Sequence, residues 1–177
     1  MVCAKHCDRI SKHDSVRDII KCYLSYGALS SRIVQRETPG LIVGKKDKPA
    51  DIFVSNWHGG KSMAFDITIV SPMQKKLRAR AAKAAGVAAE EGEISKIAKC
   101  EDKCRKAGFD FTPLAFSTYG GYGEEAKSVL KYIICMAADR LGLTRSAVAT
   151  RIRQKISLAI MKHNANMILT RGYACTA

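Results

Sequence analysis

Two aspartates stand out because each lies beside or within an apolar segment. Asp51 directly precedes the run Ile-Phe-Val, and Asp66 lies inside the run Ala-Phe-Asp-Ile-Thr-Ile-Val that ends at Val70. A carboxylate in such a run is costly to bury unless a hydrogen-bond donor or a cation compensates for it. Gly59 and Gly60 predict a turn between two strands, which can bring both carboxylates to one face. Paired hard oxygen ligands are what Mg²⁺ requires to activate water against a phosphodiester.

Each aspartate also has a simpler interpretation. Asp51 follows Pro49 and Ala50, so it alternatively caps a turn. Asp66 is harder to explain without a function, because it lies in the middle of a predicted strand among apolar residues. We therefore weigh a metal site against a structural role separately for the two residues.

The net charge indicates the class of partner. Thirty Lys and Arg residues against sixteen Asp and Glu residues give a formal charge of +14, which favours a polyanion such as nucleic acid, or an acidic membrane surface. The alternative is a basic protein whose charges serve solubility alone. The residues that we expect to contact a phosphate backbone are Lys45, Lys46, Lys48, Lys75, Lys76, Arg78, Arg151 and Arg153. For the first three, a loop that is only solvated is the alternative.

Several protein classes are disfavoured by the sequence. No apolar run approaches the roughly eighteen residues of a membrane span, and the first residues include Lys5, His6 and Asp8 where a signal peptide needs an apolar core. Seven cysteines at scattered spacing fit reduced thiols better than a disulfide framework. We therefore expect an intracellular protein without a membrane partner.

The N-terminal segment contains a weak metal-binding signal. Cys3, His6 and Cys7 lie within five residues, but a structural zinc site needs four ligands, and no second ligand cluster follows closely. Ser11 then predicts the N-cap of a helix that ends near Gly27.

Two polar residues fall in the first turn of that predicted helix. His13 and Asp14 follow Ser11 directly, and we expect them either to cap the helix or to face a site beyond its N-terminus.

The remaining pattern predicts alternating strands and helices. We expect a strand over 32–36, then the two strands around Gly59 and Gly60. A helix over 73–89, which Gly86 interrupts, is followed by a helix over 90–106 and a strand over 109–117. Pro113 indicates that it lies either at a sheet edge or at the end of a strand. A helix over 124–141 and a long helix capped by Thr144 complete the chain. This order predicts an α/β fold with a mixed sheet and helices on both faces.

This order of elements and four segments of the chain resemble the PD-(D/E)xK nuclease fold. More narrowly, the chain resembles the restriction-like endonuclease domain of non-LTR retrotransposon reverse transcriptases and derived copies of that domain. The matching segments are Lys12–Asp18, Lys48–Trp57 with its Pro-Ala-Asp, Ala64–Pro72 with its Phe-Asp-Ile-Thr, and Gly108–Ala115 followed by Gly120-Gly121. The resemblance spans almost the whole chain, from about Cys3 to the last helix.

The resemblance implies a domain organisation. Residues 11–120 would form an αβββαβ nuclease core, and residues 121–172 a C-terminal helical hairpin packed on it. Residues 1–10 would be the remnant of a zinc knuckle, with Cys3 and Cys7 in its closing half. The opening half of the knuckle is absent, so we do not expect zinc binding by this chain alone.

The resemblance also implies a site. Asp51, Asp66 and the backbone carbonyl of Ile67 would hold Mg²⁺ or Mn²⁺. The family's lysine is missing two positions after Asp66, where Thr68 stands, so the catalytic lysine would come from the following helix as Lys96 or Lys99. His13, Asp14 and Thr68 would be accessory residues.

These residues imply a metal-dependent endodeoxyribonuclease that nicks DNA by phosphodiester hydrolysis. The expected partners are DNA, or RNA as a second choice, and a reverse transcriptase domain if the chain is part of a longer polyprotein; the expected location is the nucleus. The competing hypothesis is a decayed nuclease fold that acts as a basic DNA- or RNA-binding module. A third is a structural domain whose acids form internal salt bridges.

Overall fold

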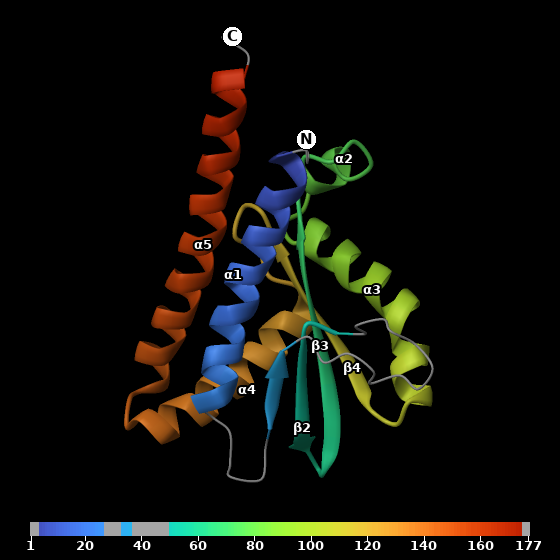
Figure 1. The fold of residues 1–177 in the computed structure, drawn as a ribbon, viewed down its shortest axis with the longest axis vertical. Coiled ribbons are helices and arrows are strands. Elements are labelled where there is room, and N and C mark those ends of the chain that lie inside the picture. Colours follow the sequence, from blue (N-terminus) through green and yellow to red (C-terminus); the bar gives the residue numbers. More distant parts are fainter. Residues whose placement is uncertain (1–3, 27–32, 37–49, 175–177) are drawn as a thin grey trace.

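The computed structural model of the protein describes residues 4–26, 33–36 and 50–174. Figure 1 shows helices on both sides of a sheet. In chain order the elements are α1 (Ala4–Tyr26), β1 (Val34–Arg36), β2 (Ile52–His58), β3 (Lys61–Val70), α2 (Arg78–Ala81), α3 (Val87–Lys106), β4 (Asp110–Ser117), α4 (Glu124–Leu141) and α5 (Arg145–Ala174). None of the helices in these ranges is both long enough and apolar enough to cross a bilayer.

The strands described here form one mixed sheet in the order β1-β2-β3-β4. The first three strands pair antiparallel, and β4 pairs parallel to β3. Gly59 and Gly60 make the turn between β2 and β3, with φ angles of 60° and 83° that favour glycine. Pro113 lies on the edge strand β4, opposite Asp66. The predicted α/β class, hairpin and edge strand are therefore confirmed.

Alternation along β3 gives the sheet two different faces. Phe65 and Ile67 point into the main apolar core, which contains side chains of α1, α4 and α5. Ala64 faces the other side, where it packs with Cys104 of α3. Asp66 also belongs to this second side, because its carboxylate meets Lys96 of α3. Figure 1 shows α3 apart from α1, α4 and α5, across the sheet.

The two C-terminal helices agree with the sequence pattern. Thr144 caps α5, since its Oγ1 accepts a hydrogen bond of 3.2 Å from the backbone N–H of Ala147. The predicted apolar stripe of α5 is buried in the main core, through Val148, Ile152, Ile156 and Ile160. Helix α5 lies along α1 (Figure 1), where His163 Nε2 is 2.9 Å from Ser15 Oγ.

The predicted start of the first helix was wrong. Helix α1 begins at Ala4, because no Gly or Pro separates Ala4 from Ser11 and the helix continues through both. Ser11 is therefore not an N-cap; its carbonyl accepts a hydrogen bond from Ser15 Oγ. His13 and Asp14 lie in the middle of α1, so the interpretation of these two residues as caps is wrong as well.

The predicted helix over 73–89 was also wrong. Only Arg78–Ala81 form a helix within it before Gly86, with a φ of 88°, leads into α3. The Ala- and Lys-rich composition gives a high helix propensity, but between Met73 and Gly86 only Leu77 is buried. Without an apolar stripe to pack on the protein, propensity alone does not maintain a long helix.

Candidate active site

A cavity of about 780 Å³ lies where α1, β3 and α3 meet. The side chains of Asp51, Asp66 and Lys96 all line it. Asp51 lies directly before β2, Asp66 lies in β3, and Lys96 lies in α3. Three residues that the sequence singled out on three separate segments therefore share one cavity.

Pairing between β2 and β3 fixes the position of Asp51. Its backbone N–H donates to the Phe65 carbonyl at 3.0 Å. Its side chain accepts a hydrogen bond of 2.6 Å at Oδ2 from the backbone N–H of Ile67. Asp51 is thus fastened to β3 through both its main chain and its carboxylate, one residue away from Asp66 on that strand.

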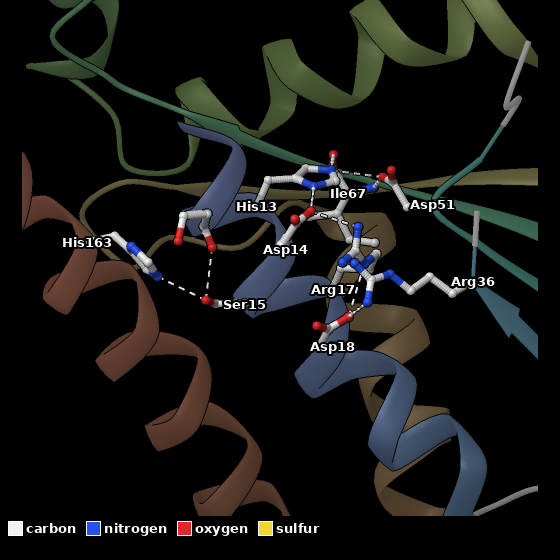
Figure 2. A network of polar contacts seen from close by, with 10 residues as sticks. His13, Asp14, Ser15, Arg17, Asp18, Arg36, Asp51, Ile67 and His163 are labelled. Carbon is white, nitrogen blue, oxygen red and sulfur yellow. Dashed lines mark hydrogen bonds and ion pairs between the residues drawn. The ribbon is translucent and has the colours of Figure 1, made fainter. Parts of the chain in front are cut away.

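His13 reaches the same place from α1. Its Nε2 lies 3.0 Å from Asp51 Oδ2 and 3.1 Å from the Ile67 carbonyl oxygen. Both of these atoms are acceptors, so Nε2 carries a proton and donates to them. The hydrogen bond to Asp51 raises the pKa of His13 to about 8, against the opposing effect of burial. Figure 2 shows the imidazole between Asp51 and the main chain of Ile67.

A buried arginine holds this histidine in place. The other ring nitrogen of His13 lies 3.3 Å from Asp14 Oδ1, which accepts a hydrogen bond of 2.7 Å from Arg17 Nη1. Arg17 is fully buried and also donates from Nε to Asp18 Oδ1 at 3.1 Å. Figure 2 shows this chain of polar contacts along α1. Arg17 therefore orients Asp14, and Asp14 orients the imidazole toward Asp51.

Asp66 is in a less polar environment. It is buried, and its Oδ2 lies 2.7 Å from Lys96 Nζ. Burial raises the pKa of Asp66, and the charge of Asp51 raises it further, whereas Lys96 opposes the change. Burial alone would lower the pKa of Lys96, but the ion pair with Asp66 outweighs it and raises that pKa. The effect of Asp51 on Asp66 indicates that the two carboxylates are close enough to interact.

Three oxygen donors of this site could take part in holding a small divalent cation. Asp51 Oδ2 and the Ile67 carbonyl both lie within 3.1 Å of one atom, His13 Nε2, so they converge on a position where a protonated imidazole now lies. Asp66 adds a carboxylate in the same cavity. Among the residues that the structure describes, no three His, Cys, Asp or Glu side chains are grouped to hold a metal. Two carboxylates and a carbonyl with water completing the shell is an arrangement that Mg²⁺ accepts.

The other predicted site residues lie in different places. Thr68 lines the cavity, but Lys99 does not; Lys99 lines a smaller hollow of about 210 Å³ beside Lys96. The cations that we predicted to contact nucleic acid and that lie within the described ranges are exposed: Lys75, Lys76, Arg78, Arg151 and Arg153. The predicted basic loop with Lys45, Lys46 and Lys48 lies outside the described residues, as does Cys3. The backbone of Cys7 belongs to α1.

Two residues that matter here carried no assigned role in the sequence analysis. Arg17 could have been noticed from its spacing to Asp14, because residues three apart on a helix are neighbours. Glu93 is buried and accepts hydrogen bonds of 3.1 Å and 3.3 Å from the backbone N–H groups of Glu125 and Ala126. It thereby joins α3 to the N-terminus of α4, and a side chain at Gly123 would overlap its carboxylate. Sequence pattern offers no signal for that contact.

No protein-family model matches the chain, and no curated protein matches it. The function of the cavity therefore has to be inferred from the residues that line it. These provide carboxylate and carbonyl oxygens for a hard cation, an ammonium group beside one carboxylate, and an imidazole beside the other.

Proposed function

We propose that the chain is a metal-dependent DNA endonuclease of the restriction-like PD-(D/E)xK type, from the branch found in non-LTR retrotransposon proteins. One observation carries this proposal: Asp51, Asp66 and Lys96 line a single cavity, with the lysine supplied by the helix that follows the second aspartate's strand. The resemblance to PD-(D/E)xK nucleases implies this residue set, and two carboxylates beside an ammonium group can hold a divalent ion and stabilise charge on a phosphodiester. The site of action of such a protein would be the nucleus.

Some cavity residues would hold the ion, and others would stabilise the negative charge of the transition state. Asp51, Asp66 and the Ile67 carbonyl would hold Mg²⁺ or Mn²⁺, which supplies water activation and neutralises charge on the scissile phosphate. Lys96 would donate a hydrogen bond to the oxygen that gains negative charge in the transition state. It lies in α3 and is held by Asp66, so it needs little rearrangement to do so.

His13 would position Asp51 until the ion binds. Without the ion, its raised pKa of about 8 keeps the imidazole mainly protonated at neutral pH, and it donates to Asp51 Oδ2 and the Ile67 carbonyl. The ion would displace Nε2 from these two oxygen atoms, and the freed imidazole would then face the phosphate as a hydrogen-bond donor. Outside the cavity, exposed residues such as Lys75, Arg78 and Arg151 would contact the DNA backbone, which predicts binding that weakens steeply with salt.

Nicking of supercoiled plasmid at low salt tests this proposal. Wild-type protein with Mg²⁺ or Mn²⁺ is expected to nick the plasmid, and EDTA is expected to abolish nicking. Asp66→Asn and Lys96→Ala are each expected to lower the rate by about 100-fold or more. Lys99→Ala is the matched control: it removes the same charge three residues away on α3, outside the cavity, and is expected to leave the rate within about twofold. Nicking that survives Asp66→Asn would refute the site.

A basic DNA- or RNA-binding module is the second candidate. The observations in its favour are the ion pair of Asp66 with Lys96 at 2.7 Å, in which each charge already has a partner, and the formal charge of +14. In the plasmid experiment this candidate predicts salt-sensitive retention of DNA without cleavage and without response to the ion. If the protein neither retains nor cleaves the plasmid, the remaining hypothesis is the purely structural role of the acidic residues.

A further inference from the structure

Two hollows lie one after the other along one side of α5, and together we call them the α5 groove. The basic hollow, about 670 Å³, lies between α4 and α5. The apolar hollow, about 490 Å³, lies between α5 and the turn Thr118–Gly120. A single row of α5 residues at four-residue spacing lines both hollows in succession: Ala149, Arg153, Ser157, Met161 and Ala165.

Neighbouring residues line the two hollows and the active-site cavity in turn. Arg153 lines the basic hollow, and Ser157, one turn further along α5, lines the apolar hollow. Thr118 lines both the apolar hollow and the active-site cavity. The side chain of Asn164 lines the apolar hollow and donates to the Thr118 carbonyl at 2.8 Å, which fixes the turn against α5. The three hollows therefore follow one another along the protein from the start of α5 to the catalytic residues.

Charge in the groove has one sign. The basic hollow is lined by Lys127, Lys131, Arg145 and Arg153, and within the described part of the chain no Asp or Glu lines either hollow. Lys127 is paired with the exposed Glu124, at 2.6 Å. The N-terminus of the long helix α5, at Arg145, adds its own positive partial charge. This end of the groove is complementary to phosphate groups.

The middle of the groove presents apolar side chains to solvent. Tyr119 and Ile168 are each 71% exposed, and Met161 is 65% exposed. An exposed aromatic ring beside a cationic track is the arrangement on which unpaired bases stack. A duplex keeps its base faces stacked inside, so it can use the cations but not the ring or the apolar wall. The combination favours a single strand over a duplex.

We propose that this groove binds a single-stranded segment of DNA and leads it into the active-site cavity. The inference rests on the proposed nuclease function, and it specifies the substrate as DNA with an unpaired strand next to the scissile bond. The phosphates lie on Arg145, Lys131 and Arg153, and a base stacks on Tyr119.

Binding measured in EDTA tests the groove separately from catalysis. The probes are a fluorescent twelve-nucleotide oligo(dT), its duplex with oligo(dA), and the matching oligo(rU). Fluorescence anisotropy measures the binding of each probe at several salt concentrations. Arg145→Gln/Arg153→Gln removes two groove charges. Lys103→Gln/Lys106→Gln is the matched control, because it removes two exposed charges from α3 across the sheet. Tyr119→Ala removes the ring, and Tyr119→Phe keeps it.

The single-stranded DNA is expected to bind about tenfold tighter than the duplex, and no more weakly than the RNA. The double Arg variant is expected to bind it about tenfold more weakly and to reduce the salt slope by about 1.4, since each lost phosphate contact on a single strand contributes about 0.7. Tyr119→Ala is expected to weaken binding by about tenfold while Tyr119→Phe and the α3 control bind as the wild type does.

Three results would overturn the proposed role of the groove. These are equal affinity for the duplex and the single strand, a higher affinity for the RNA than for the DNA, and groove variants that bind the single strand as the α3 control does. None of these depends on metal or on Asp66. Failure of plasmid nicking with intact single-strand binding would instead refute the nuclease and leave the groove standing.

Discussion

The two faces of the sheet are built from side chains of different size and polarity. Toward α1, α4 and α5 the buried side chains are large and apolar, among them Phe65, Ile67, Leu114 and Ile133. Toward α3 the smaller cluster contains Ala50, Ala64, Cys104 and Phe109, and the same face carries the ion pair of Asp66 with Lys96. Burial of apolar area is the main source of stability, so stability should depend mostly on the first face, while the second face supplies Asp66 and Lys96 to the active-site cavity.

On the face of the sheet toward α3, this helix lies very close to β3. A Cβ at Gly92 would lie 2.9 Å from Val70 Cγ2 and 3.1 Å from Thr68 Cγ2. Glycine at this position therefore allows α3 to approach β3, and Lys96, one turn further along the helix, reaches Asp66. The close approach that leaves little room for an apolar core is what places the lysine on the carboxylate.

The largest expected effect compares one buried residue from each face. Phe65→Ala should lower the free energy of unfolding by about 3–5 kcal/mol, because it leaves a cavity in the main core. Cys104→Ala, equally buried but on the α3 face, should cost only about 1 kcal/mol. Urea denaturation of both variants measures the difference. Equal losses would show that the two faces contribute alike.

A smaller effect is expected at the close approach itself. Gly92→Ala should lower the free energy of unfolding by about 1–2 kcal/mol, since the added methyl pushes α3 from β3 despite the higher helix propensity of alanine. Nicking should fall as well, because Lys96 moves with α3. The loss of stability that Gly92→Ala causes should be smaller when it is measured in a Val70→Ala background than in the wild type. A fully additive pair would show that Val70 is not the obstacle.

The smallest expected effect concerns the pH dependence of stability in EDTA. The pKa of His13 is about 8 in the folded protein and 6.5 for an ordinary histidine. The folded state thus holds the proton more tightly, and the stabilisation is complete below pH 6.5, declines as the pH rises, and is lost above about pH 8. Its size should be about 1 kcal/mol after allowance for solvent screening.

Urea denaturation of the wild type and His13→Gln at pH 6 and pH 9 checks this expectation. The wild type should exceed the variant by more at pH 6 than at pH 9. A difference that does not change with pH, or that grows at pH 9, would contradict the assigned contact between His13 and Asp51.

Much of the fold follows from local pattern. The glycine turn, the apolar run around Asp66 and the stripe of α5 each predict an element that the structure contains. Pro113 predicts the edge strand because proline cannot donate to a neighbour. The prediction for the start of α1 was wrong because Ser11 suits an N-cap, although no Gly or Pro precedes it back to Ala4. The segment 73–89 could not be predicted from local pattern, because a helix there depends on a surface to pack on.

The site was harder to predict from the sequence than the fold was. The acidic residues draw attention because a charge in an apolar run is unusual, but pattern alone does not pair Asp66 with a lysine thirty residues later. That pairing depends on how α3 crosses between the parallel strands β3 and β4. The contact of His13 with Asp51 depends likewise on the packing of α1 against β3. Arg17 reads as an ordinary exposed helix cation until its burial is known.

The most direct test of the central claim measures metal binding at the paired aspartates by thermal unfolding. With about 10 mM Mn²⁺ or Mg²⁺ and a dissociation constant near 1 mM, the wild type should gain about 1.4 kcal/mol, or roughly 3–6 °C in melting temperature. Asp51→Asn and Asp66→Asn should abolish the gain, whereas Asp139→Asn, at an exposed position on α4, should keep it. A wild type that does not respond to the ion, or aspartate variants that respond as it does, would contradict the metal site.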